Sequence, residues 1–485
     1  PNCPQHIAAF YAVLKLGATV VEHNPLYTAH ELSGPFADHG ARVVIAWDKA
    51  APTLEKLRGT TSLETIISVN MIEAMPAFKQ LALKLPIKKI KEQRDALSAP
   101  APNTVPWEAL IGSAIGGEGD DIESEPTVTK DTIALILYTS GTTGTPKGAQ
   151  LTHGNLFANC LQGKNWVPGL GEQHERMLAA LPMFHAYGLT MVGTLSFYIG
   201  GEMILLPAPR IPLIMDVMKK HTPTWLPGVP TLYEKIVEAA EADNINISGV
   251  RNAFCGAATL PVSTVEKWER FTGGRLVEGY GLTETSPVIV GNPMNDDRRP
   301  GYVGIPFPDT EVRIANPENL GETQPDGTEG EILVRGPQVF PGYLNQPEAT
   351  EKSFHDGWYR TGDIGVMEED GFIRLVARIK EVIITGGFNV YPVEVEEAMR
   401  DHPDIIDLAV VGRPREDGSE DVVACVTLRD GAAMDPEGLK DFARERLTRY
   451  KVPRTFYHFE ELARDQMGKI RRREVQEDLL RLLEK

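Results

Sequence analysis

Short apolar runs alternate with helical patterns along most of this 485-residue chain, and this alternation restricts the fold more than any other feature. Strands are expected at residues 18–21, 42–47, 65–69, 132–138, 202–206 and 224–226. Strands that alternate with helices imply largely parallel sheets covered by helices. We therefore expect an α/β fold with a large N-terminal domain of mixed, largely parallel sheets.

A second, smaller α+β domain is expected at the C-terminus, because a chain of this length exceeds one ordinary hydrophobic core. After residue 327 the sequence changes to tight turns and short strands, followed by helices at 393–399 and 436–447 and strands at 408–411 and 422–428. The expected domains are residues 1–379 and 380–485. The chain starts at Pro1, and a helix at 5–16 that ends before Gly17 leads at once into a strand. We expect the N-terminus to be incomplete.

The charge balance excludes a general nucleic-acid binder, because the formal net charge is −18 and phosphate contacts need clustered Lys and Arg. The four cysteines are scattered and lack metal-ligand or disulfide spacing, so we expect a cytoplasmic protein. The apolar segment 177–201 is long enough for a membrane span. Pro182, His185 and four glycines favour a buried strand followed by a core helix instead.

One basic segment interrupts the acidic chain. Residues 71–94 contain Lys79, Lys84, Lys88, Lys89, Lys91 and Arg94. The apolar residues Phe78, Leu81, Leu85 and Ile90 fall near helical spacing, so the segment could lie on a membrane surface. A solvated surface insertion is the plainer interpretation.

A glycine-rich and threonine-rich loop follows the strand at 132–138. It contains Thr139, Ser140, Gly141, Thr142, Thr143, Gly144 and Lys147. Small side chains allow backbone N–H groups to approach anionic oxygens, hydroxyls add donors, and the lysine adds charge. The nucleotide-kinase P-loop requires Gly-Lys-Ser/Thr, whereas this chain has Pro146-Lys147-Gly148. The loop therefore predicts phosphate binding of another kind.

Residues 138–148 (YTSGTTGTPKG) resemble the signature of the acyl-adenylate-forming (AMP-binding) superfamily. Five further segments resemble its other motifs in the family's order: 182–188 (PMFHAYG), 279–285 (GYGLTET), 359–365 (YRTGDIG), 378–387 (RIKEVIITGG) and 468–471 (GKIR). The resemblance extends over essentially the whole chain. Ala377 departs from the Gly or Asp common before Arg378 in the family.

The resemblance implies a role for each matching residue. Lys469 would reach the α-phosphate and the substrate carboxylate, and Glu284, with Thr139, would hold Mg²⁺. Asp363 and Arg378 would bind the ribose hydroxyls, and Tyr280 would stack on adenine. His185 matches a position near the substrate carboxylate, although a lone buried His is as often a core residue. The other expected ATP/AMP contacts are Gly256, Ala257, Ala258, Gly279, Gly281 and Thr283.

The same resemblance implies two half-reactions with ATP and coenzyme A as co-substrates. The first forms an acyl adenylate from a carboxylic acid and ATP, and the second transfers the acyl group to coenzyme A. The family rotates its C-terminal domain between them, and Lys380 matches the hinge. Gly386 and Gly387 would then line the coenzyme A tunnel. The chain looks most like bacterial long-chain fatty acid CoA ligases. The alternatives are an aryl CoA ligase of the coumarate type and a non-catalytic nucleotide-binding homologue. The sequence does not indicate an oligomeric state.

These roles predict that the two half-reactions depend differently on Lys469. The variant Lys469→Ala should lose most adenylate formation, because the cation at the α-phosphate is removed. It should keep thioester formation from supplied acyl adenylate. Both half-reactions are to be measured separately, and equal loss of the two would contradict the assignment.

Overall fold

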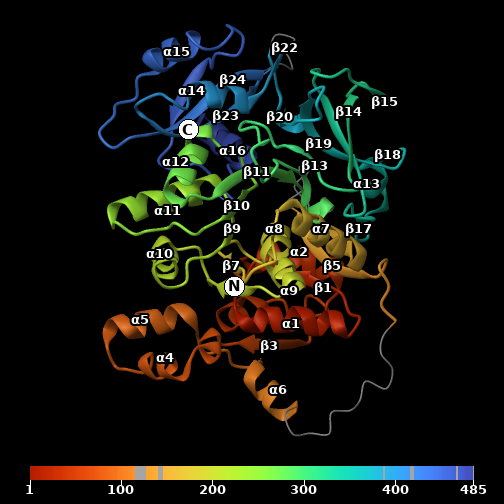
Figure 1. Cartoon of the computed structure of the whole chain (residues 1–485), viewed down its shortest axis with the longest axis vertical. Coiled ribbons are helices and arrows are strands. Elements are labelled where there is room, and N and C mark those ends of the chain that lie inside the picture. Colours follow the sequence, from red (N-terminus) through yellow and green to blue (C-terminus); the bar gives the residue numbers. More distant parts are fainter. Residues whose placement is uncertain (115–126, 140–145, 386–387, 416–419, 466–467, 484–485) are drawn as a thin grey trace.

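The structure is a computed structural model that describes residues 1–114, 127–139, 146–385, 388–415, 420–465 and 468–483. In Figure 1 the N-terminal elements (red and orange) lie at the lower end of the molecule and the C-terminal unit (blue) lies at the upper end. The strands and helices between them form mixed α/β layers. The expected fold class is confirmed.

A seven-stranded sheet forms the centre of the molecule. Its order is β13-β12-β11-β10-β9-β7-β8. The strands are β7 (Arg176–Ala179), β8 (Glu202–Leu205), β9 (Trp225–Gly228), β10 (Asn252–Cys255), β11 (Arg275–Gly281), β12 (Val288–Gly291) and β13 (Ile305–Pro306). The five strands from β8 to β11 along the sheet are parallel, and β12 and β13 are antiparallel to their neighbours.

Both faces of this sheet are buried, which explains the continuous apolar runs in its strands. In β9, Leu226 packs into one core and Trp225 into the other; in β10, Ala253 and Phe254 divide in the same way. The first core includes α10 (Ile211–Lys220), α11 (Pro230–Ala242) and α12 (Val262–Thr272). The second includes α7 (His153–Trp166), the π-helical turn Leu189–Thr194 and α9 (Leu195–Ile199).

Two smaller sheets lie towards the N-terminal end. One has the order β1-β5-β6-β17, with β1 (Val20–Glu22), β5 (Ile133–Thr139), β6 (Lys147–Thr152) and β17 (Gly342–Tyr343). The other is parallel and consists of β2 (Val43–Trp47), β3 (Thr65–Val69) and β4 (Val105–Pro106). The helices of this region are α1 (Pro4–Lys15), α2 (Ala29–His39), α3 (Ala51–Glu55), α4 (Ala77–Ala82), α5 (Lys88–Leu97) and α6 (Trp107–Ala114).

A six-stranded sheet departs from the expected parallel pattern, because all its pairings are antiparallel. It contains β14 (Glu311–Asn316), β15 (Asn319–Thr323), β16 (Gly330–Arg335), β18 (Phe354–His355), β19 (Trp358–Met367) and β20 (Ile373–Arg378). Short turns connect most of its strands, and such connections only allow antiparallel neighbours. Helix α13 (Pro347–Lys352) precedes β18.

The C-terminal unit follows the short 3₁₀ helix Ile379–Glu381. Its strands are β21 (Ile383–Thr385), β22 (Phe388–Val390), β23 (Ile405–Pro414), β24 (Glu420–Leu428) and β25 (Thr455–His458). Its helices are α14 (Pro392–Met399), α15 (Pro436–Arg444) and α16 (Arg472–Leu483). The expected helices and strands of this region are present, with ends shifted by a few residues. The domain boundary at residue 380 stays a prediction.

The apolar segment 177–201 forms strand β7, the short helix α8 (Ala186–Gly188), the π-helical turn and α9. Within the part of the chain that the structure describes, no helix is long and apolar enough to cross a membrane.

A pair of leucines tests how much the central sheet contributes to stability. Leu226 is 0% exposed and Leu26 is 73% exposed. Leu226→Ala should lower the free energy of unfolding by about 2–5 kcal/mol, because it leaves a cavity in the first core. Leu26→Ala should change it by less than about 0.5 kcal/mol. Urea unfolding followed by circular dichroism gives both values, and equal effects would contradict the assigned core.

Candidate functional site

Asp363 on β19 contacts side chains from two other strands, β11 and β20. The hydroxyl of Tyr280, on β11, donates to Oδ2 of Asp363 at 2.6 Å. Nε of Arg378, on β20, lies 3.2 Å from Oδ1, and the two residues are partners in the β19–β20 register. Asp363 is 5% exposed and Tyr280 8%. A buried carboxylate requires such partners, so the ion pair fixes where Arg378 lies.

A second buried carboxylate, Glu284, lies in the 3₁₀ turn Thr283–Thr285. Tyr343 on β17 donates its hydroxyl to Glu284 Oε1 at 2.8 Å. Burial raises the pKa of Glu284 above its ordinary value, while the Tyr343 bond, Arg378 and Lys147 act in the opposite direction. Nζ of Lys147 lies 5.0 Å from the centre of the Tyr343 ring. Tyr343 therefore links the carboxylate to the lysine, and sequence reasoning missed it.

Lys469 comes from the C-terminal unit. Its side chain is partly buried, and Gly468 before it has a φ of +79°, which favours glycine. Burial and the neighbouring Arg378 lower the pKa of Lys469 from 10.5 to about 8, against the opposite effect of Asp363 and Glu381. Lys469 is therefore close enough to Arg378 and Asp363 for their charges to influence it, although the three residues belong to motifs that are far apart in the chain.

The loop between β5 and β6 lies partly outside the described residues. The expected phosphate-binding residues that lie outside them are Ser140, Gly141, Thr142, Thr143 and Gly144. Its two ends are described: Thr139 and Lys147 are register partners. Asp38, in the last turn of α2, accepts from the Tyr138 hydroxyl at 2.7 Å and from the Asn345 side chain at 3.2 Å. Asp38 thus connects α2 to β5 and to Asn345, which follows β17. The sequence did not indicate this contact.

Gly279 and Gly281 are required by packing. A Cβ on Gly279 would lie 2.1 Å from the Phe254 ring, and one on Gly281 would lie 2.0 Å from the Pro287 carbonyl oxygen. Gly256, directly after β10, would bring a Cβ to 3.1 Å from the Tyr187 ring. The next residue, Ala257, has a φ of +68°, and Ala258 follows it in the same loop. Thr283 opens the 3₁₀ turn that carries Glu284.

His185 and Lys380 lie at the border between the body and the C-terminal unit. The His185 ring accepts a hydrogen bond from the Tyr187 backbone N–H at 3.3 Å. Burial lowers the pKa of His185, and nearby Asp465 opposes this effect. Lys380 lies in the turn after β20, where burial and Lys147 lower its pKa. The expected tunnel residues Gly386 and Gly387 lie outside the described residues.

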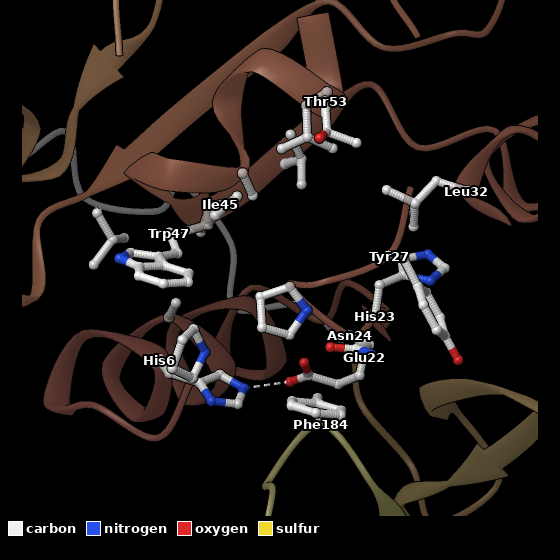
Figure 2. A pocket seen from close by; sticks show the side chains of 18 of the residues that line it. His6, Glu22, His23, Asn24, Tyr27, Leu32, Ile45, Trp47, Thr53 and Phe184 are labelled. Carbon is white, nitrogen blue, oxygen red and sulfur yellow. Dashed lines mark hydrogen bonds and ion pairs between the residues drawn. The ribbon is translucent and has the colours of Figure 1, made fainter. Parts of the chain in front are cut away.

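A cavity lies between β1 and β2, and its lining includes Phe184, the residue before His185 (Figure 2). His6 and Glu22 form an ion pair at 2.7 Å on one wall of the cavity, and Phe184 and Trp47 contribute to its lining. None of the expected site residues lines it. The side chains of Trp225 and Tyr233 are 0% exposed core residues.

Solved structures with the same fold identify the structural class. The structure resembles ATP-bound MatB from Rhodopseudomonas palustris with a TM-score of 0.78 and 29% identity, over 98% of this chain and 86% of that chain. It also resembles the O-succinylbenzoate coenzyme A synthetase of Bacillus subtilis in complex with ATP and magnesium ion. There the TM-score is 0.75 and the identity 25%, over 97% of this chain and 87% of that chain.

The family follows from the sequence comparisons. The model of the AMP-binding enzyme family matches residues 1–344, and that of the AMP-binding enzyme C-terminal domain matches residues 394–469. The long-chain-fatty-acid–CoA ligase of Bacillus subtilis (strain 168) is 39% identical over 99% of this chain and 84% of its own length. A feruloyl-CoA synthase from Amycolatopsis sp is 33% identical over 98% of this chain and 87% of its own length. The chain belongs to the AMP-binding enzyme family.

The lowered pKa of Lys469 can be measured by amine labelling. Because only the neutral amine reacts, labelling of Lys469 should rise with pH around a midpoint near 8. Arg378→Gln removes a neighbouring positive charge, so the midpoint should move upward. Mass spectrometry after brief acetylation gives the extent at each pH, with the exposed Lys219 as a reference for the reagent. An unchanged midpoint in Arg378→Gln would contradict the arrangement.

Proposed function

We propose that this protein is an ATP-dependent acid–thiol ligase that acts on long-chain fatty acids. In the first step a fatty acid carboxylate attacks the α-phosphorus of ATP, and the bond to the β-phosphate oxygen breaks, which releases pyrophosphate. In the second step the coenzyme A thiol attacks the acyl adenylate, and AMP leaves. The observation that carries the proposal is the buried Asp363–Arg378–Tyr280 cluster, whose Arg378 and Asp363 are close enough to Lys469 to influence its charge.

The arrangement of charge supports the first step. Carboxylate and triphosphate are both anionic, so the attack needs cations placed where charge develops. Lys469, Arg378 and Lys147 supply them locally in a chain with a net charge of −18. ATP adds negative charge beside Lys469, which favours the protonated lysine. We assign Lys469 to the α-phosphate and the substrate carboxylate, and Lys147 to the loop that contacts the other phosphates.

Glu284 and Thr139 fit the proposed Mg²⁺ site. Mg²⁺ prefers hard oxygen ligands and is commonly held by one or two carboxylates together with phosphates and water. Glu284 is a buried carboxylate with one partner on Oε1, so acceptor positions remain. Across the described residues, no group of three or more His, Cys, Asp or Glu side chains could hold a metal ion by itself. The bound ion would neutralise the triphosphate.

Asp363 is the proposed ribose ligand. Two of its acceptor positions are used by Tyr280 and Arg378, and an ionised carboxylate has about four. Arg378 can donate to the second hydroxyl. The small residues Gly256, Ala257 and Ala258 are assigned to the adenine edge, together with Gly279, Tyr280, Gly281 and Thr283. His185 is assigned to the substrate carboxylate, because it lies near Asp465 in the loop that carries Lys469.

The second step requires the C-terminal unit to move, because Lys469 occupies the place where a thiol must approach. We propose residues 1–379 and 380–485 as the two domains and Lys380 as the hinge. Its position in a short turn directly after β20 supports this assignment. Gly386 and Gly387 are assigned to the coenzyme A tunnel.

The proposed setting is the cytoplasm, with contact to membranes through residues 71–94. All four cysteines are free and buried, which supports a reducing compartment. We propose no nucleic-acid partner. An aryl acid is the second candidate substrate, because one relative at 33% identity is a feruloyl-CoA synthase. A non-catalytic nucleotide-binding role is disfavoured by the intact Lys469 and Glu284.

ATP–pyrophosphate exchange with a series of acids tests the proposal. Acids from acetate to palmitate, and coumarate, are offered one at a time with Mg²⁺, and exchange should be fastest with a long-chain fatty acid. Lys469→Ala should reduce it about a hundredfold or more, as expected for loss of one transition-state cation. Highest exchange with coumarate would favour the aryl ligase. No exchange with any acid would leave only nucleotide binding.

A further inference from the structure

Arg472, the first residue of α16, is a largely buried cation to which the proposed function assigns no role. Its side chain is 12% exposed. Nε and Nη2 donate to the two carboxylate oxygens of Glu396, at 3.0 Å and 2.6 Å. Nη1 donates to Oε2 of Glu381 at 2.6 Å. The guanidinium is thus shared between two carboxylates, and its planar fork suits both of them.

The two carboxylates lie in different parts of the C-terminal unit. Glu381 ends the 3₁₀ turn after β20 and directly follows the proposed hinge residue Lys380. Glu396 lies in α14, and its Oε1 also accepts from the Val410 backbone N–H of β23 at 2.8 Å. Arg472 therefore joins the hinge turn, α14 and α16 at one point.

A short stretch of hydrogen-bonded chain connects Lys469 to Arg472. The Asp465 carboxylate accepts from the Lys469 backbone N–H at 2.9 Å, and the Asp465 N–H donates to the Lys469 carbonyl at 2.8 Å. The Arg471 N–H donates to the Ala463 carbonyl at 2.9 Å. Because Lys469 lies so close to the start of α16 in the chain, a shift of this helix end would move the lysine as well.

The residues that Arg472 joins all follow the proposed hinge. A rotation at residue 380 therefore leaves its bonds to Glu381 and Glu396 intact. By contrast, the Tyr391 hydroxyl donates to Glu329 at 2.9 Å, which is a contact between the two proposed domains. The bonds of Arg472 belong to the interior of the unit that moves.

We propose that Arg472 is a positioning residue for adenylate formation, because it ties the start of α16 to the hinge turn. The C-terminal unit then turns as one piece and carries Lys469 to the α-phosphate. This inference rests on the proposed function of Lys469. In Arg472→Lys the charge is kept, but one ammonium group cannot hold two carboxylates in the fixed geometry of a guanidinium fork. Charge alone is therefore not sufficient at this position.

A direct effect of charge on Lys469 can be separated from an effect on its position. Burial is the main reason for the lowered pKa of Lys469; Arg472 lowers it further, whereas Glu381 opposes this effect. If the two charges acted only on the protonation of Lys469, Arg472→Gln and Glu381→Gln would shift the pH dependence of adenylate formation in opposite directions. If they hold α16 in place, both variants lose activity.

ATP–pyrophosphate exchange of the full chain, with the acid that gives the fastest exchange, tests the proposal. Arg472→Lys, Arg472→Gln and Glu381→Gln should each lower kcat by about tenfold to a hundredfold, because a small displacement of a catalytic group is costly. KM for ATP should change by less than about twofold, since the residues of the body are unchanged. The double variant Arg472→Gln/Glu381→Gln should be no slower than the slower single variant.

Thioester formation from supplied acyl adenylate is the second measurement. It should fall by less than about threefold in the same variants, because Lys469 is not needed for this step. A loss of folding would instead lower both half-reactions. The melting temperature of each variant is measured as well, and Arg472→Lys keeps the test valid if Arg472→Gln does not fold.

Arg473→Gln is the matched control. This arginine is the next residue of α16, its side chain is 59% exposed, and it pairs with Glu477 of the same helix at 3.0 Å. Exchange by the control should stay within about twofold of wild type, as expected for an exposed ion pair.

Three results would overturn the proposal. They are wild-type kcat in Arg472→Lys and Glu381→Gln, equal loss of both half-reactions in a folded variant, and opposite shifts in pH dependence with unchanged kcat. In all three the wild-type protein still catalyses exchange. Failure of the proposed function differs from them, because the wild type would then exchange with no acid at all, and the role of Arg472 would fall with it.

Discussion

The buried carboxylate of Asp363 is the interaction on which the arrangement of this molecule depends. It connects β11 of the central sheet with β19 and β20 of the antiparallel sheet, through Tyr280 and Arg378. An unpaired charge at 5% exposure would be strongly destabilising, so the two sheets can only meet where both partners reach it. The same junction holds the guanidinium of Arg378, which lowers the pKa of Lys469 in the C-terminal unit. One ion pair thus serves the packing of the body and the position of the site.

The electrostatics of the site are local. The chain is acidic overall, yet Arg378 lies close enough to Lys469, and Lys147 close enough to Lys380, to lower the pKa of the second residue of each pair. This influence is clear at Lys469, because burial and Arg378 both lower its pKa. A polyanionic nucleotide beside these cations would raise the pKa of Lys469 again.

The sequence predicted the fold class and supplied the candidate site residues, for two different reasons. Alternating apolar runs located the strands of the central sheet, because both its faces are buried. The site residues were found through short segments that resemble a family, and the structure brings Glu284, Tyr280, Asp363, Arg378 and Lys469 together. Tyr343 and Asp38 were missed, since each acts on a residue far away in the chain. The short strands expected after residue 327 are present, but their antiparallel pairing into one sheet was not predicted, and Pro86 separates α4 from α5 in the basic segment 71–94.

The packing around Gly279 and Gly281 has a consequence for how relatives of this protein are compared. A side chain at either position would overlap the Phe254 ring or the Pro287 carbonyl whether or not a nucleotide is present. Selection for folding alone would therefore keep both glycines unchanged during evolution. Their presence in a distant homologue is evidence that β11 meets its neighbours in the same way, and it is not by itself evidence that the homologue binds a nucleotide.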